Sequence, residues 1–273
     1  AHAFDVARAV RESFGRRSLD EESRARVVKF FAQQEDFARQ ARVDHPEGFG
    51  VAKGKNLLLI QVEALQTWVI GAEVGGREVT PYLNSLRSEG LSFSTVIDQT
   101  AQGKTSDGEY LVLNSQHPLP RGATSFLRAD NHFWTLAHAL AGEGYVTSSA
   151  HPYRRGFWNR AVLHPRYGFA SSVFKRELGE GQFVGWGLAD GLFFERMLPR
   201  IQSAATPWFA FWVTLSLHHP YDHFPDNLVG ELELGDLEGF TTQPMERARQ
   251  ALGVYVSEEI ATEVLDQEDR LAP

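Results

Sequence analysis

The sequence has no cysteine among its 273 residues. This absence excludes disulfide bonds and thiolate metal sites, and it leaves the cellular compartment open. No stretch approaches the ~18 consecutive apolar residues of a membrane-spanning helix, and no signal-peptide pattern opens the chain. We therefore expect any membrane anchor of the natural protein to lie outside this chain.

The chain also lacks a positive charge balance, because 35 acidic residues outnumber 27 lysines and arginines and give a formal net charge of -8. A broad nucleic-acid interface needs a basic surface, so we expect no nucleic-acid partner, although local basic spots can still bind a phosphate. With 42% hydrophobic and 23% charged residues, the composition is that of a soluble globular protein, long enough for one large α/β domain.

Alternating strand and helix patterns predict an α/β fold with a mostly parallel central sheet flanked by helices. The continuous apolar runs at 56–62 and 207–217 are typical of parallel strands buried on both faces. Two more strands are expected at 91–99 and 145–150. The expected helices span residues 81–89, 106–115, 131–144 and 187–204.

Residues that typically cap or interrupt helices indicate where these helices begin and end. Thr80 is expected as the N-cap of the helix that begins with Pro81, and Pro199 is expected to kink or break the last helix. Near the N-terminus, Ser18 and Glu21 form a capping-box pattern ahead of a helical apolar stripe. The stripe consists of Val27, Phe30, Phe31 and Phe37. We expect this N-terminal helix to pack on the main domain.

Polar residues follow the predicted strands at the points where these end. Glu63 ends the first strand, Thr105 follows the second within Gly-Lys-Thr-Ser-Asp, His151 ends the third and His218 the last. Because ligands of parallel sheets bind at the carboxyl ends of the strands, we expect these residues to meet at one edge. Arg160 follows His151 closely and is expected there too.

Each of these residues has a simpler interpretation. Thr105 is also a good helix cap, Glu63 could be a solvated or paired carboxylate, and His151 could be a histidine satisfied by its surroundings. The Gly103–Ser106 stretch is not a phosphate-binding P-loop, because that motif needs a glycine where Asp98 stands. The functional interpretation is that a divalent metal on Glu63 activates the poorly nucleophilic threonine hydroxyl for attack on a phosphoryl or sulfuryl group.

Five segments together resemble one family. They are "NLLLIQVEALQ", "GREVTPYLNSL", "QTAQGKTSDGEYLVLNSQHPLPRG", "HPYRRGFWNR" and "TLSLHHPYDHFP". From about residue 48 to about residue 225, the chain resembles the lipoteichoic acid synthase group of phosphoglycerol transferases. This group belongs to the sulfatase-like branch of the alkaline phosphatase superfamily, so the resemblance implies that fold.

The resemblance implies a specific activity and site. A threonine at a Mn²⁺ or Mg²⁺ ion attacks phosphatidylglycerol or another glycerophosphate donor, and a glycan or polymer acceptor then takes the glycerophosphate. By motif match, Thr105 is the nucleophile, and Glu63 and Thr105 are metal ligands. The residues matching substrate-binding positions are His151, Trp158, Arg160 and His218. The implied location is the extracytoplasmic face of a bacterial cell membrane, reached through a membrane segment absent from this chain.

The resemblance also implies a division of the chain and reveals two departures. Residues 1–50 resemble a helical lead-in arm, 51–239 the catalytic core, and 240–273 form a C-terminal helical segment whose placement the sequence does not give. The family has serine where Ala64 stands, which is a minor difference. Its remaining metal ligands lie on an Asp-His pair in a Gly-Asp-His context after a later buried strand, and residues 235–273 contain no such motif and no histidine; Gly235-Asp236 is followed by leucine. We therefore expect a fold incomplete at its C-terminus and little activity from this chain alone.

Two other functions remain open. One is a sulfatase-like phosphodiesterase or hydrolase with water as acceptor; the usual sulfatase nucleophile derives from cysteine or serine, whereas threonine stands at that position. The other is a catalytically inactive domain that binds anionic headgroups, which the missing Asp-His pair favours. The acceptor and the oligomeric state cannot be deduced from the sequence.

Overall fold

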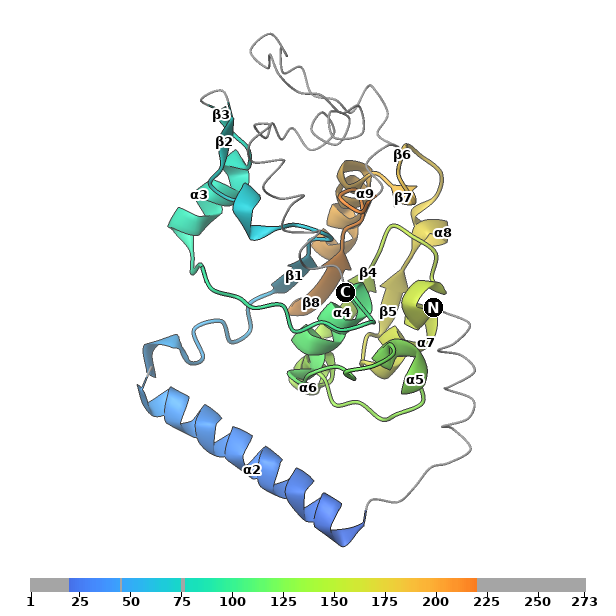
Figure 1. The fold of residues 1–273 in the computed structure, drawn as a ribbon. Coiled ribbons are helices and arrows are strands. Elements are labelled where there is room, and N and C mark those ends of the chain that lie inside the picture. The colour runs from blue at the N-terminus through green and yellow to red at the C-terminus, as the bar shows by residue number, and fades with distance from the viewer. Residues whose placement is uncertain (1–19, 45, 75–76, 220–273) are drawn as a thin grey trace, which may run out of the picture.

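The computed structural model describes residues 20–44, 46–74 and 77–219, and its centre is a four-stranded parallel sheet (Figure 1). The strands lie in the order β1 (Leu57–Gln61), β8 (Trp208–Val213), β4 (Val146–Ala150) and β5 (Ser171–Val173). All three pairings are parallel. The expected α/β architecture with a parallel sheet is confirmed.

Helices and short elements connect these strands. The α-helices are α2 (Glu21–Asp44), α3 (Pro81–Glu89), α4 (Thr105–Asn114), α5 (Thr124–Leu127), α6 (Leu136–Gly142), α7 (Arg160–Arg166), α8 (Lys175–Leu178) and α9 (Asp190–Gln202). The 3-10 turns are η1 (Pro46–Gly48), η2 (Thr67–Val69) and η3 (Phe157–Asn159). Two small hairpins pair β2 (Glu73–Val74) with β3 (Arg77–Glu78) and β6 (Phe183–Val184) with β7 (Gly187–Leu188).

Strand β8 is apolar along its length because both of its faces are covered. Successive side chains of a strand point to opposite faces. Phe209, Phe211 and Val213 pack in the hydrophobic cluster that α4, α6 and α7 share. Ala210 and Trp212 pack in the other cluster, against α9. The sheet is thus enclosed by helices on both faces, and its carboxyl edge is left for the polar residues that follow the strands.

The strand expected at 91–99 does not form. The segment has no regular secondary structure, and its apolar side chains are exposed, with Leu91 93% and Phe93 79% accessible. A strand needs a neighbour to satisfy its backbone groups, and among the described residues none pairs with it. The alternating pattern of Val96, Ile97 and their neighbours is therefore not sufficient to produce a strand here.

Helix α2 differs from expectation in its packing. None of its residues is buried, so the expectation that it packs on the main domain is wrong (Figure 1). Asp20 accepts a hydrogen bond from the Ser23 amide at its start, while Ser18 lies outside the described residues. None of the helices in the described part of the chain is long and apolar enough to cross a membrane. The expected boundary at 239 also falls outside the described residues.

Two helix ends differ in detail from the sequence-based expectations. Thr80 stands at the N-cap of α3 but does not cap it; its hydroxyl donates instead to the Val69 carbonyl and contacts Asn84 Oδ1. Helix α9 contains Pro199 without ending there and continues to Gln202. A proline in the last turn removes only one amide donor, so the helix continues past it.

Candidate active site

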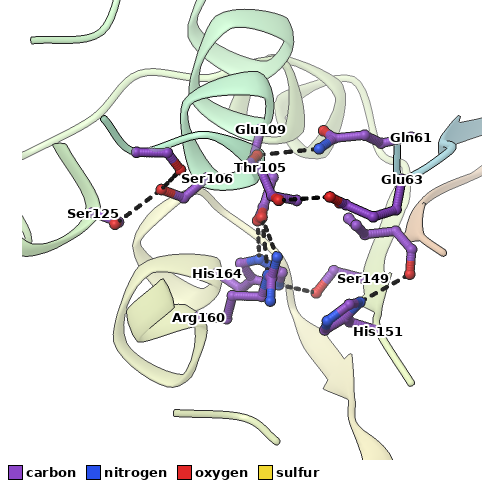
Figure 2. A network of polar contacts seen from close by, with 12 residues as sticks. Gln61, Glu63, Thr105, Ser106, Glu109, Ser125, Ser149, His151, Arg160 and His164 are labelled. Carbon is purple, nitrogen blue, oxygen red and sulfur yellow. Dashed lines mark hydrogen bonds and ion pairs between the residues drawn. The ribbon is translucent and has the colours of Figure 1, made fainter. Parts of the chain in front are cut away.

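Thr105 and Glu63 meet where the first strand ends and helix α4 begins (Figure 2). The Thr105 hydroxyl donates to Glu63 Oε1 over 3.0 Å. Gln61 Nε2 donates to the Thr105 carbonyl, and the Glu63 amide donates to Thr214 Oγ1 beyond β8. Lys104, not Thr105, occupies the N-cap position of α4. The simpler interpretation of Thr105 as a helix cap is therefore wrong.

The loop before Thr105 is held by a carboxylate within the helix that follows it. Asp107 Oδ2 accepts from the amides of Ala101 and Gly103, over 3.0 Å and 2.9 Å. Lys104 adopts φ 44° and ψ -116°, a conformation that residues other than glycine rarely take. A Cβ at Gly103 would collide with the Asp107 carboxylate. Asp107 and Gly103 thus fix the approach of the chain to Thr105.

A buried ion pair links helix α4 to helix α7 (Figure 2). Arg160, only 1% exposed, donates from Nε and Nη2 to Glu109 Oε1 over 2.9 Å and 2.6 Å. Glu109 Oε2 lies 3.0 Å from His164 Nε2. Burial alone would raise the pKa of Glu109, but Arg160 and His164 outweigh burial and hold it at about 2. Arg160 Nη1 is buried and has no hydrogen-bond partner among the described residues.

The tautomer of His164 follows from its two neighbours. Its Nε2 faces an ionised carboxylate, so Nε2 carries the proton and donates to Glu109. Its Nδ1 lies 2.8 Å from Ser149 Oγ and accepts from that hydroxyl. Ser149 in turn lies 2.7 Å from Ser172 Oγ. Burial lowers the pKa of His164 despite the hydrogen bond to Glu109, so the ring is neutral at pH 7.

His151 follows β4 and presents one free ring nitrogen. Its Nδ1 lies 3.0 Å from the Val213 carbonyl, which only an N–H can satisfy. Burial, reinforced by the charge of Arg160, holds the pKa of His151 well below its usual value. The ring is therefore neutral, with Nε2 as an acceptor. This Nε2 is buried and has no partner among the described residues.

Trp158 and His218 belong to one series of ring contacts, in which the Phe157 ring lies 5.8 Å from that of Trp186. Trp158 and Asn159 take two consecutive left-handed conformations, and Asn159 Nδ2 donates to the Ser125 carbonyl. The Trp158 ring packs against the Phe157 ring at 5.6 Å between centroids. The His218 ring lies 4.2 Å from that of Trp186.

The turn after β8, which leads to His218, is held by Asp190. Its two carboxylate oxygens accept from the amides of Leu215 and Ser216. Burial raises the pKa of Asp190 above its usual value, against the effect of these hydrogen bonds. The sequence does not predict a role for Asp190 in the site, because this residue lies within the long helical pattern at 187–204.

Three of the predicted residues act on the pKa of a fourth, Glu63. Burial raises the pKa of Glu63, and the Thr105 hydrogen bond and the charges of His218 and Arg160 partly offset this effect.

The sequence did not predict that Glu109 and His164 belong to the site. Glu109 lies one helical turn beyond Thr105, within a segment that looks like an ordinary amphipathic helix, and only the fold brings it to Arg160.

Glu63 and Thr105 offer oxygen ligands of the kind that Mn²⁺ and Mg²⁺ take. Two ligands are too few for a stable divalent site. In the described ranges no group of three His, Asp or Glu side chains could hold a metal ion. The described residues therefore do not form a complete site for the expected metal.

The chain is similar in sequence to proteins of one known family. Residues 55–244 match the family model for Sulfatase. The lipoteichoic acid synthase-like protein YvgJ of Bacillus subtilis is 34% identical over 188 residues, which cover 68% of this chain and 30% of that protein. This chain therefore spans about a third of the length of that curated relative.

Two solved structures share the fold. The lipoteichoic acid synthase LtaP from Listeria monocytogenes has a TM-score of 0.68 and 22% identity, covering 75% of this chain and 50% of that one. The Streptococcus pyogenes phosphoglycerol transferase GacH, in complex with sn-glycerol-1-phosphate, has a TM-score of 0.56 and 14% identity, covering 80% of this chain and 59% of that one. The expected sulfatase-like fold is confirmed.

Proposed function

This chain belongs to the sulfatase family and resembles its lipoteichoic acid synthases, and from that premise we propose that it transfers glycerophosphate through Thr105. The donor is phosphatidylglycerol or another glycerophosphate lipid, and the acceptor is a hydroxyl of a glycan or polymer. The observation that carries the proposal is the hydrogen bond from the Thr105 hydroxyl to Glu63 at the start of α4. This bond holds a hydroxyl at a helix N-terminus, where an anionic phosphate is favoured.

The reaction has two balanced steps. In the first, Thr105 Oγ1 forms a bond to the phosphorus, the bond to the diacylglycerol oxygen breaks, and the threonine proton ends on the diacylglycerol that leaves. In the second, the oxygen of an acceptor hydroxyl forms a bond to the phosphorus, the bond from Thr105 Oγ1 to the phosphorus breaks, and the proton of the acceptor hydroxyl moves to Thr105 Oγ1. Splitting the transfer in this way lets one donor site serve an acceptor that arrives later.

Arg160 and His151 are suited to different parts of the glycerophosphate group. Arg160 Nη1 is a buried donor without a partner among the described residues, and it suits a phosphate oxygen. His151 Nε2 is a neutral acceptor, and it suits a glycerol hydroxyl rather than a second anionic oxygen. Trp158 and His218 are proposed to bound the same pocket on its aromatic side.

A Mn²⁺ or Mg²⁺ ion belongs to this proposal as the group that lowers the pKa of the threonine hydroxyl. Glu63 and Thr105 are its proposed ligands, and a working site needs more ligands than the described residues supply. The extracytoplasmic face of the cell membrane, where phosphatidylglycerol headgroups are accessible, is the proposed location.

A second candidate is an inactive domain that binds anionic headgroups. The shortage of metal ligands among the described residues favours it. The two candidates share the anion pocket and differ in covalent chemistry. Incubation of a Mn²⁺-loaded form of the protein with phosphatidylglycerol, followed by peptide mass spectrometry, separates them: transfer leaves a glycerophosphoryl group on the Thr105 peptide, whereas a binding domain leaves every peptide unmodified.

A further inference from the structure

The guanidinium of Arg160 is oriented by a single carboxylate. Glu109 Oε1 accepts from both Nε and Nη2, which fixes the plane of the guanidinium group. The remaining nitrogen, Nη1, is buried without a partner among the described residues. An arginine held in this way presents one donor in a defined direction.

The carboxylate of Glu109 is itself held in place from its other side. His164 Nε2 donates to Oε2, and Ser149 fixes the His164 ring through Nδ1. Neither the carboxylate nor the imidazole can rotate without breaking a buried hydrogen bond, which is costly away from water. This chain of contacts runs from β4 through α7 to α4 (Figure 2).

We infer that Glu109 is a positioning residue that aims Arg160 Nη1 at a phosphate group beside Thr105. The inference rests on the proposed function, because it assigns a target to that nitrogen. Glu109 and Thr105 lie on the same helix, one turn or about 6 Å apart along its axis. A shift of α4 would therefore move the nucleophile and the anchor of the arginine together, which keeps the two in register.

Stability alone is a weaker explanation of this pair. Replacing a buried ion pair by apolar residues of similar volume is often neutral or stabilising, so burial of two charges is not a common route to stability. The pair also leaves a buried donor nitrogen without a partner among the described residues, which a purely structural contact would not need. A role for Nη1 in binding a ligand explains both the buried ion pair and the nitrogen without a partner.

Positioning and simple electrostatics predict opposite effects for one substitution. Glu109→Gln removes a negative charge next to Arg160, so attraction by net charge alone would strengthen the binding of an anion. If Glu109 acts by orienting Arg160, the same change weakens binding. Glu109→Asp keeps the charge but withdraws the carboxylate by one methylene, so positioning again predicts weaker binding, whereas net charge predicts no change.

The test is calorimetric titration of the metal-free chain with sn-glycerol-1-phosphate. We expect Glu109→Gln to weaken binding about tenfold and Glu109→Asp to weaken it less. The control is Leu113→Ala, a position of the hydrophobic core one turn further along α4, and we expect it to change affinity by less than about twofold. Combining Glu109→Gln with Arg160→Gln should bind no more weakly than Arg160→Gln alone.

The outcomes distinguish the inference from the proposed function. If the wild-type chain binds no glycerophosphate, the proposed function fails and the inference fails with it. If binding depends on Arg160 but is unchanged or stronger in Glu109→Gln, the inference fails and the proposed function stands. Should Glu109→Gln not fold, as judged by circular dichroism, the Glu109→Asp result decides by the same criterion.

Discussion

The hydroxyl of Thr105 donates to the carboxylate of Glu63 across 3.0 Å, although 42 residues separate them in sequence. The parallel sheet produces this contact, because β1 delivers Glu63 to the edge at which α4 begins. The relationship excludes the role of Thr105 as a helix cap and places its oxygen at the positive end of a helix.

Replacing Thr105 by alanine removes the proposed nucleophile. We expect Thr105→Ala to abolish formation of the glycerophosphoryl-enzyme in any metal-loaded form that turns over phosphatidylglycerol. The lost hydrogen bond to Glu63 should lower the free energy of unfolding by only about 1–2 kcal/mol. Turnover assays paired with melting curves measure both quantities, and Thr105→Ser, which keeps a hydroxyl, is the matched control. Turnover retained by the alanine variant would remove Thr105 from the mechanism.

Metal binding by the chain should be weak. With Glu63 and Thr105 as the protein ligands, we expect a dissociation constant for Mn²⁺ of about 1 mM or weaker. Calorimetry measures it, and Glu63→Gln should remove the remaining binding. Tight binding at micromolar Mn²⁺ would show that the site is completed by ligands outside the described residues.

Acid should weaken the fold through Glu109. Its folded pKa of about 2 lies below its ordinary value of 4.5, so its contribution is complete above about pH 4.5 and is lost as the pH falls towards 2. The contribution is about 3 kcal/mol. His151 and His164, whose pKa values are also lowered, reduce stability in the same direction below about pH 6.5.

Urea unfolding at a series of pH values isolates the part due to Glu109. Below about pH 4.5, the wild-type free energy of unfolding should fall more steeply than that of Glu109→Gln, because only the wild type has a carboxyl at this position to protonate. Parallel curves for the two proteins across this range would contradict the assignment.

A side chain at Gly103 should disturb the loop before Thr105. Gly103→Ala forces its Cβ against the Asp107 carboxylate, and we expect a loss of about 1–3 kcal/mol from this overpacking. Gly142→Ala is the control, since nothing lies within 4 Å of the added Cβ at the end of α6. Chemical denaturation of both variants provides the measurement, and equal stability of the two would count against the tight loop.

The sequence predicts those parts of the fold and the site that depend on local patterns. Apolar runs located β1 and β8, and their carboxyl ends located Glu63 and His218, because parallel strands bring their ends to one edge. The ion pair of Glu109 with Arg160 joins residues 51 positions apart. The periodicity of the sequence does not predict such a contact. Only the packing of α7 against α4 creates it.

The failed predictions have physical causes of the same kind. The pattern at 91–99 favours a strand, but β-propensity acts only when a neighbouring strand and a core face are present. The apolar stripe of α2 likewise predicts burial, and the described residues offer it no surface to cover. In both cases the tertiary environment that the pattern requires is absent from the described residues.

The most direct test of the central claim is a crystal structure of the chain soaked with sn-glycerol-1-phosphate. The account predicts a phosphorus atom about 3–3.5 Å from Thr105 Oγ1, near enough for attack. It also predicts a hydrogen bond from Arg160 Nη1 to a phosphate oxygen and one from a glycerol hydroxyl to His151 Nε2. A glycerophosphate bound elsewhere, with Arg160 Nη1 still lacking a partner, would contradict the assignment of this site to glycerophosphate transfer.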